Sequence, residues 1–317
     1  MNPRMRRRRL QWLPMILLVL SPWKAGLALG DAPPPRFENV HYGPDERQVL
    51  DFWPAPGREV AAPLVVYIHG GGFVSGDKTK IRGQRILGEF LEAGISVAAI
   101  NYRFLSPSVV LQDVLGDTAL AVQFLRAQSV AWGVDPTRVA AFGTSAGAGS
   151  SLWLATHDDM ADAASDDPVR RQSTRLTCAG SLSGQFTYNL PRWREVFGEE
   201  AYDRFAGRYR DPGLYGLASV TEMESAAGRA ALAEVDFYAH ISPDDPPCYI
   251  AADLPDGAPT SSSEFLHHPL HSRLLYERCR AQGVQVIADI PAFGIVPKSD
   301  CPQTLQEFLI TQLLTRD

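Results

Sequence analysis

A serine occupies the centre of the pentapeptide at residues 143–147, whose sequence GTSAG fits the pattern G-x-S-x-G. A short apolar run at residues 138–142 precedes it and helix-like sequence follows, so the pattern predicts a sharp turn from a strand into a helix. Such a turn holds the serine hydroxyl at a helix N-terminus, where backbone N–H groups and the helix dipole favour developing negative charge. We therefore interpret Ser145 as a nucleophile. The alternative is a purely structural turn built from small residues.

Three consecutive glycines, residues 70–72, follow His69 at the end of an apolar run. Glycine costs backbone entropy on folding, so a run of three makes sense where backbone N–H groups must approach a ligand closely. We expect the N–H groups of Gly71 and Gly72, together with that of Ala146, to stabilise an oxyanion. The alternative is an ordinary glycine loop. His69 itself is expected to order the loop through hydrogen bonds.

Four short motifs, taken together, resemble those of one known family. They are HGGGF at residues 69–73, NYR at 101–103, DP at 135–136 and GTSAG at 143–147. The combination is similar to that of α/β hydrolases of the esterase/lipase type with an H-G-G-G oxyanion motif, in the feruloyl-esterase-like and hormone-sensitive-lipase-like branches. The resemblance is strong over residues 64–150 and extends towards residue 314 only in the order of the elements. It implies an α/β-hydrolase fold and ester hydrolysis through an acyl-enzyme, without a cofactor.

The resemblance also implies a catalytic acid just after the strand predicted at residues 248–252. In the family's scheme a carboxylate orients a histidine, which takes the proton of Ser145. Asp256 fits the family's spacing best, and Asp253 is the alternative. Both can instead be plain turn residues, because aspartate and the sequence Pro-Asp-Gly are common in turns.

The histidine departs from the family's pattern. The family histidine follows the last strand, but Ile295 stands at that place, and residues 288–317 contain no histidine. Without a base, a serine hydroxyl is a poor nucleophile at neutral pH. The base has therefore either moved elsewhere in the chain or been lost.

Three histidines follow the strand at residues 248–252 and open the next helix, at the end of the sheet where Ser145 is expected. They are His267, His268 and His271. We take His268 as the candidate base of this group. Two alternatives remain: a segment that only leads into a helix, and a protein that has lost catalysis but retains the pocket for binding.

Short apolar runs alternate with longer amphipathic ones, which predicts βαβ units and a mainly parallel sheet flanked by helices. Strands are expected at residues 48–53, 64–69, 95–101, 138–142, 176–182, 248–252 and 284–290. Helices are expected at residues 80–93, 113–128, 270–282 and 303–314, and directly after Ser145. One segment, residues 186–245, has scattered helical patches and no clear strand, so we expect a largely helical insertion there.

The N-terminus has a basic head, an apolar run at residues 10–20 and small residues at 28–30, which is the order of a secretory signal. We expect a signal peptide at residues 1–30, a hydrolase domain at 31–317 and export to a periplasm or the outside. An uncleaved anchor is the alternative, although the apolar run is shorter than the roughly 20 residues that a spanning helix needs. No other segment is long and apolar enough to span a bilayer.

The composition limits the kinds of molecule that the protein is expected to bind. A net charge of −6 argues against nucleic acid, and the absence of C-x-x-C and H-E-x-x-H patterns leaves a zinc site unsupported. The leading hypothesis is an exported hydrolase of carboxylic esters, acting on a small molecule or on acyl groups of a polysaccharide. The rival hypotheses are a non-catalytic relative that binds an ester-like or carbohydrate ligand, and a peptidase of the same fold. The sequence leaves the oligomeric state open.

Overall fold

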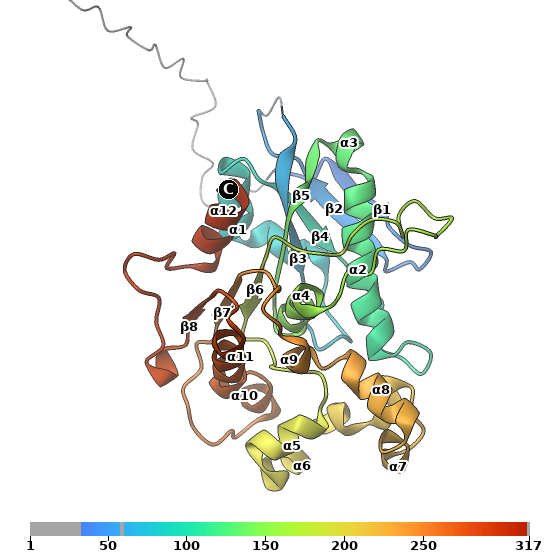
Figure 1. The fold of residues 1–317 in the computed structure, drawn as a ribbon, viewed down its shortest axis with the longest axis vertical. Helices are drawn as coiled ribbons and strands as arrows, with labels where there is room; N and C mark the ends of the chain where they lie inside the picture. The colour runs from blue at the N-terminus through green and yellow to red at the C-terminus, as the bar shows by residue number, and fades with distance from the viewer. Residues whose placement is uncertain (1–32, 58–59, 316–317) are drawn as a thin grey trace, which may run out of the picture.

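The computed structural model of the protein describes residues 33–57 and 60–315. They form an eight-stranded sheet in the order β1-β2-β4-β3-β5-β6-β7-β8 (Figure 1). Its two antiparallel pairs are β1 with β2 and β2 with β4, and the other neighbours run parallel. The strands are β1 (Phe37–His41), β2 (Val49–Trp53), β3 (Ala62–Ile68), β4 (Ser96–Ile100), β5 (Val134–Thr144), β6 (Cys178–Leu182), β7 (Cys248–Ala251) and β8 (Val286–Asp289). The predicted α/β-hydrolase fold is confirmed.

Both faces of the sheet are covered, which explains why the central strands are continuous apolar runs. Leu64 and Val66 of β3 belong to one buried cluster and Val65 and Tyr67 to another, because successive side chains of a strand point to opposite faces. Helices α1 (Arg85–Glu92) and α12 (Leu305–Leu314) cover the second cluster. The first is covered by α2 (Leu111–Ala127), α4 (Ala146–Thr156) and α11 (Pro269–Gln282), with the short α3 (Ser129–Trp132) beside β5.

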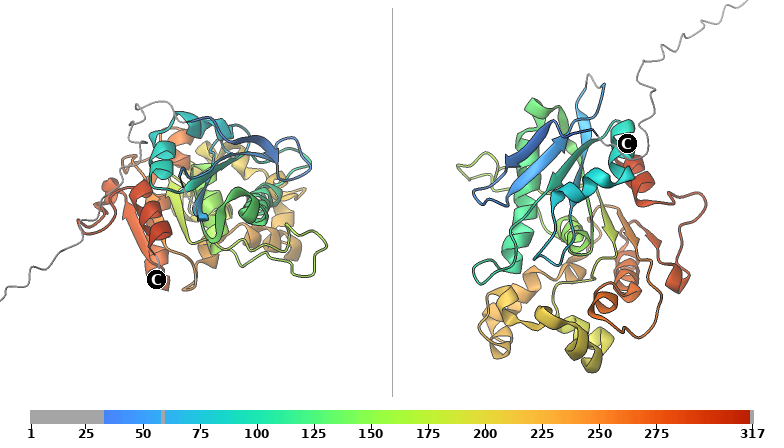
Figure 2. Two further views of the ribbon diagram at one scale, coloured as in Figure 1. Left: turned by 90° about the horizontal axis from the view of Figure 1, so that it is seen from above. Right: turned by 180° about the vertical axis from the view of Figure 1, so that it is seen from behind.

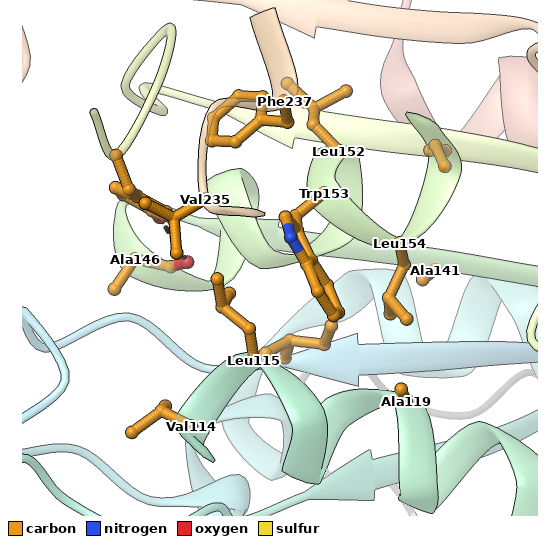
Figure 3. Close-up of a cluster of buried hydrophobic side chains, with 14 of the residues drawn as sticks. Val114, Leu115, Ala119, Ala141, Ala146, Leu152, Trp153, Leu154, Val235 and Phe237 are labelled. Atoms are coloured by element: carbon orange, nitrogen blue, oxygen red, sulfur yellow. Dashed lines mark hydrogen bonds between the residues drawn. The ribbon is translucent and has the colours of Figure 1, made fainter. Parts of the chain in front are cut away.

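Helix α4 is the element that carries Ser145 at its start, and it is held deep in the core. Its Trp153 points towards Leu115 of α2 and lies beneath Val235 and Phe237 (Figure 3). The indole Nε1 of Trp153 donates a hydrogen bond of 2.9 Å to the carbonyl of Glu234. Helix α4 is therefore anchored between the sheet and the segment that follows β6.

That segment, between β6 and β7, contains the helices of the predicted insertion and no strand. They are α5 (Pro191–Phe197), α6 (Glu199–Phe205), η2 (Gly207–Arg210), η3 (Pro212–Tyr215), α7 (Val220–Met223), α8 (Ala226–Glu234) and α9 (Phe237–His240). Seen from the front and from behind, they lie beyond one end of the sheet, away from α3 (Figures 1 and 2). Helix α10 (Ser262–Leu266) follows β7 and contacts α6.

Three local expectations need correction. The strand β1 was not predicted, because its exposed and half-buried side chains show no apolar alternation. The helix expected at residues 80–93 is divided into η1 (Lys78–Gly83) and α1, since Gln84 between them has an extended backbone (φ −103°, ψ 134°). The last helix starts at Leu305 because the side chain of Thr304 caps it.

The predicted signal peptide lies outside the described residues, and within those residues no helix is long and apolar enough to cross a membrane.

Candidate active site

Ser145 lies in a strained turn between β5 and α4. Its backbone (φ 56°, ψ −119°) is in a region that residues other than glycine rarely adopt. The flanking glycines are required by close approach, because a Cβ on Gly143 or on Gly147 would collide with the carbonyl oxygen of Ile68. The turn therefore holds the hydroxyl of Ser145 at the end of β5 and the start of α4, as the G-x-S-x-G pattern indicates.

The imidazole of His267 contacts this hydroxyl. Nε2 of His267 lies 2.8 Å from Oγ of Ser145, and Nδ1 lies 2.9 Å from the backbone carbonyl of Ser263. Since a carbonyl oxygen only accepts, Nδ1 carries the proton and Nε2 presents its lone pair to the serine hydroxyl. This is the tautomer that a general base needs.

Burial lowers the pKa of His267, and this effect exceeds the opposing influences of the Ser263 carbonyl and the charge of Asp253. The charged imidazolium loses hydration in a half-buried position, so the neutral form is favoured. The side chain is thus poised to accept a proton over a wider pH range than an exposed histidine.

The selection of His268 within the histidine group is a correction. His268 precedes a proline and caps α11, with its Nδ1 accepting the N–H of Leu270 at 3.2 Å. Its Nε2 donates to the carbonyl of Gly257 at 2.9 Å. Both ring nitrogens are therefore engaged, and neither contacts Ser145.

His271, the third member of the group, is fully buried. Its Nε2 donates to the carbonyl of Phe265 at 3.1 Å, and its Nδ1 accepts the N–H of Phe186 at 3.5 Å. Burial lowers its pKa to about 3. It packs against α10 and the insertion and does not contact Ser145.

The choice of Asp256 as the acid is also a correction. Its carboxylate lies 3.6 Å from Nε2 of His268, not against His267, and it is half exposed. Asp253 accepts a hydrogen bond of 3.5 Å from the hydroxyl of Ser183 and forms none with His267. Neither carboxylate after β7 therefore contacts Nδ1 of His267, which lies against the Ser263 carbonyl instead.

The loop after β8, where the family histidine would stand, has become a simple structural turn. Ile290 and Ile295 close it with two backbone hydrogen bonds of 2.6 and 3.3 Å around η4 (Pro291–Phe293). None of its residues lines the cavity in front of Ser145.

The predicted oxyanion donors lie in front of the nucleophile. Gly71 and Gly72 have positive φ values of 130° and 60°, and with Ser145 they line the same cavity. Within the described part of the chain, their N–H groups and that of Ala146, the first residue of α4, form no hydrogen bond. Unpaired donors at a helix start and in a glycine loop suit a developing oxyanion.

His69 supports the glycine loop from below. Its ring stacks on Tyr102 with centroids 4.3 Å apart, and its Nδ1 donates to the carbonyl of Gly70 at 2.8 Å. The hydroxyl of Tyr102 donates to the carbonyl of His69 at 2.7 Å. Burial lowers the pKa of His69 to about 4, which keeps it neutral. These contacts agree with a structural role.

A cavity of about 750 Å³ opens in front of Ser145. Its walls come from the glycine loop, from η1 and from the insertion, and they include Tyr67, Val74, Ser75, Lys80, Gln84, Phe205, Arg208, Tyr209, Ser262 and Leu266. Lys80, Phe205, Arg208 and Tyr209 were not singled out from the sequence, because no motif marks them. The hydroxyl of Tyr209 donates to the carbonyl of Gly72 at 3.4 Å and so joins the insertion to the glycine loop.

Other aromatic residues of the insertion belong to its core and not to the cavity. Phe186, Tyr188, Trp193 and Tyr202 are all at most 5% exposed and none lines the cavity. The hydroxyl of Tyr188 donates to the carbonyl of Ala146 at 2.9 Å, which fixes the start of α4. Among the described residues, no group of histidine, cysteine and carboxylate side chains could hold a metal ion.

Solved structures with similar folds include esterases. A truncated carbohydrate esterase from gut microbiota superposes with a TM-score of 0.63 at 15% identity, over 90% of this chain and 100% of that one. An acetyl ester-xyloside bifunctional hydrolase from Caldicellulosiruptor lactoaceticus gives a TM-score of 0.57 at 20% identity, over 76% of each chain. At such low identity these likenesses show the fold alone.

The fold is that of an α/β hydrolase, and the sequence is similar to those of esterases. More specifically, the family model BD-FAE matches residues 50–178, which include the glycine loop and the nucleophile turn. The isoprenylcysteine alpha-carbonyl methylesterase ICME of Arabidopsis thaliana is 25% identical over 197 residues, covering 57% of this chain and 45% of that protein. The chain thus spans less than half the length of the curated relatives it matches.

Proposed function

We propose that the protein hydrolyses carboxylic esters through an acyl-enzyme on Ser145, with His267 as the base. The contact of 2.8 Å between Nε2 of His267 and Oγ of Ser145 carries the proposal. The tautomer set by the Ser263 carbonyl supports it, as do the esterase names of the relatives. No cofactor is needed for this chemistry.

In the first half-reaction, Nε2 of His267 takes the proton of Ser145 while Oγ attacks the ester carbonyl. The carbonyl electrons move onto oxygen, which the N–H groups of Gly71, Gly72 and Ala146 stabilise. The imidazolium keeps its Nδ1–H hydrogen bond to the Ser263 carbonyl, and its Nε2–H protonates the leaving alcohol as the ester carbonyl re-forms and the C–O bond to that alcohol breaks. A water molecule repeats the sequence on the acyl-enzyme and releases the acid.

A backbone carbonyl replaces the usual carboxylate in this arrangement. The dipole of a carbonyl orients the ring and favours the proton on Nδ1, but it stabilises the imidazolium less than a full negative charge does. We therefore infer that proton transfer to His267 is slower than in a Ser-His-Asp triad. The three oxyanion donors are unaffected by this difference.

The substrates that we propose are esters of small molecules or acyl groups on a polysaccharide. The cavity is large enough for an acyl group or a sugar ring, and two similar structures are named as a carbohydrate esterase and an acetyl ester-xyloside hydrolase.

We also propose that the protein is exported after cleavage near residue 30, as the order of basic, apolar and small residues suggests. The N-terminal sequence of the protein isolated from its natural source tests the cleavage.

Hydrolysis of p-nitrophenyl acetate at about pH 8, where an imidazole is uncharged, tests the function. The protein is compared with its Ser145→Ala variant, and labelling by a fluorophosphonate probe is measured in both. We expect activity and labelling to vanish together in the variant. If the two proteins hydrolyse the ester equally slowly and neither is labelled, the protein is a binding relative that has lost catalysis.

A further inference from the structure

The cavity in front of Ser145 is cationic, although the whole chain carries a net charge of −6. Its lining contains Lys80 and Arg208 and no aspartate or glutamate. Charges of one sign along a cleft raise the local concentration of ligands of the opposite sign. The lining of the cavity next to Ser145 therefore has the opposite sign of charge to the molecule as a whole.

The two cations come from separate elements. Lys80 belongs to η1, which follows the glycine loop, and Arg208 belongs to η2 of the insertion. The positive charge of Lys80 helps to lower the pKa of His69 behind that loop. The two side chains therefore approach the cavity from η1, beside the glycine loop, and from the insertion.

Neither cation is neutralised by a neighbour. Within residues 33–57 and 60–315, Lys80 and Arg208 form no salt bridge. Nearby cations behave differently: Arg82 pairs with Asp51 at 2.6 Å and Arg210 with Asp203 at 3.1 Å. Cations close in sequence to Lys80 and Arg208 thus pair with carboxylates, whereas the two that line the cavity do not.

We propose that this cavity selects esters that carry a carboxylate, in either the acyl or the alcohol part, and that Lys80 and Arg208 bind that group. The inference rests on the proposed ester hydrolysis and adds the substrate class. An arginine fork and a lysine ammonium both suit a carboxylate, which would meet no like charge in the cavity. A neutral ester of the same size would fill the space without using either cation.

Two matched ester pairs test the proposal and separate the two positions of the carboxylate. For the alcohol side, 3-acetoxybenzoate is compared with methyl 3-acetoxybenzoate. For the acyl side, mono-4-nitrophenyl adipate is compared with 4-nitrophenyl methyl adipate. We expect the anionic member of at least one pair to have the higher kcat/KM after correction for spontaneous hydrolysis. Raising the salt concentration to about 0.5 M should reduce that preference, since the side chains are exposed.

Substitutions assign the preference to the two cations. Lys80→Gln and Arg208→Gln should each lower the anionic-to-neutral ratio of kcat/KM by about two- to fivefold, and the double variant by roughly tenfold. Arg204→Gln is the matched control, because Arg204 is an exposed cation four residues from Arg208 that does not line the cavity. A ratio that is the same in wild type and in both single variants, or that falls equally in the control, overturns the proposal.

Binding to Ser145→Ala keeps the proposal testable if no ester is hydrolysed, an outcome that would refute the proposed function alone. The probes are 3-hydroxybenzoate and its methyl ester, measured by titration calorimetry. Tighter binding of the anion, lost in the Ser145→Ala variant that also carries Lys80→Gln and Arg208→Gln, supports a carboxylate site. Equal binding of the two probes, together with hydrolysis of neutral esters without preference, refutes the substrate class while the hydrolase function stands.

Discussion

The imidazole of His267 meets the hydroxyl of Ser145, 122 residues away in the chain, with 2.8 Å between Nε2 and Oγ. Ser145 comes from the turn after β5, and His267 from the end of α10, which follows β7. Parallel strands end at the same edge of the sheet, so both side chains reach one cavity. His267 therefore reaches Ser145 from the connection that follows β7, and not from the loop after β8.

Replacing this imidazole should remove most of the activity. We expect His267→Ala to lower kcat/KM for p-nitrophenyl acetate by about 10²- to 10⁴-fold, because general base catalysis contributes that much. The measurement is steady-state hydrolysis together with the rate of labelling by a fluorophosphonate. Loss of both rates without loss of the folded state, checked by circular dichroism, distinguishes a missing base from a missing fold.

The adjacent histidine provides the control. His268→Ala should leave kcat/KM within several-fold of wild type, because neither ring nitrogen of His268 contacts Ser145. The variant loses a cap of α11, which should reduce the free energy of unfolding by about 1 kcal/mol. If His268→Ala abolishes activity and His267→Ala does not, the assignment of the base is wrong.

The carboxylates after β7 should matter little for catalysis. Where a carboxylate holds the catalytic imidazole, its conversion to an amide costs about 10⁴-fold in rate. Here the N–H at Nδ1 donates its hydrogen bond to the Ser263 carbonyl and not to a carboxylate. We therefore expect Asp253→Asn and Asp256→Asn each to retain kcat/KM within about tenfold of wild type. The steady-state rates of both variants are the measurement. A loss of several orders of magnitude in either one would mean that its carboxylate reaches His267 during catalysis.

Much of the fold was predictable because its central strands are buried on both faces. The run at residues 64–69 has no polar interruption before His69, and it became β3 within two residues at its start and one at its end. The edge strand β1 has exposed and half-buried side chains and was missed. The strained turn at Ser145 and the glycine loop were predictable for a related reason, since each depends on glycines in a contiguous motif.

To choose among the three histidines, one must know where α10 ends and where α11 begins. A sequence signal existed: Ser261 and Glu264 form an S-x-x-E pattern, and the Ser261 hydroxyl does cap α10 by accepting the N–H of Glu264 at 3.2 Å. That cap places His267 one turn after Ser263, while Pro269 forces His268 into an extended backbone (φ −57°, ψ 134°) that caps α11. The cavity cations have no such local signal, because η1 and η2 are brought together only by tertiary packing.

The pH dependence of hydrolysis should report the lowered pKa of His267. The base works in its neutral form, and burial stabilises that form, so the acid limb of kcat/KM should lie below the usual histidine pKa of about 6.5. The negative charge of Asp253 acts in the opposite direction, and Asp253→Asn should move the limb to still lower pH. Rates measured between about pH 4 and 8 test both statements. A limb at or above the usual value, or one that rises in the variant, contradicts them.

Acid should destabilise the fold through buried neutral histidines. His271 has a folded-state pKa of about 3 and an ordinary value near 6.5 when unfolded. Below about pH 6.5 the unfolded chain therefore binds a proton that the folded protein excludes, and the stability due to this difference is lost as the pH falls towards 3. His69, with a pKa of about 4, adds to the loss in the same direction.

His271→Gln isolates this contribution, since the amide can still donate towards the carbonyl of Phe265 but does not titrate. The variant should be less stable at every pH, because the ring also packs 5.0 Å from Trp193 and 4.8 Å from Phe197 between centroids. Between about pH 6.5 and 4.5, however, its free energy of unfolding should fall by about 2–3 kcal/mol less than that of wild type. Urea unfolding at both pH values measures the difference, with exposed His41→Gln as the control. If wild type and His271→Gln lose equal stability over this interval, His271 already binds its proton in the folded state.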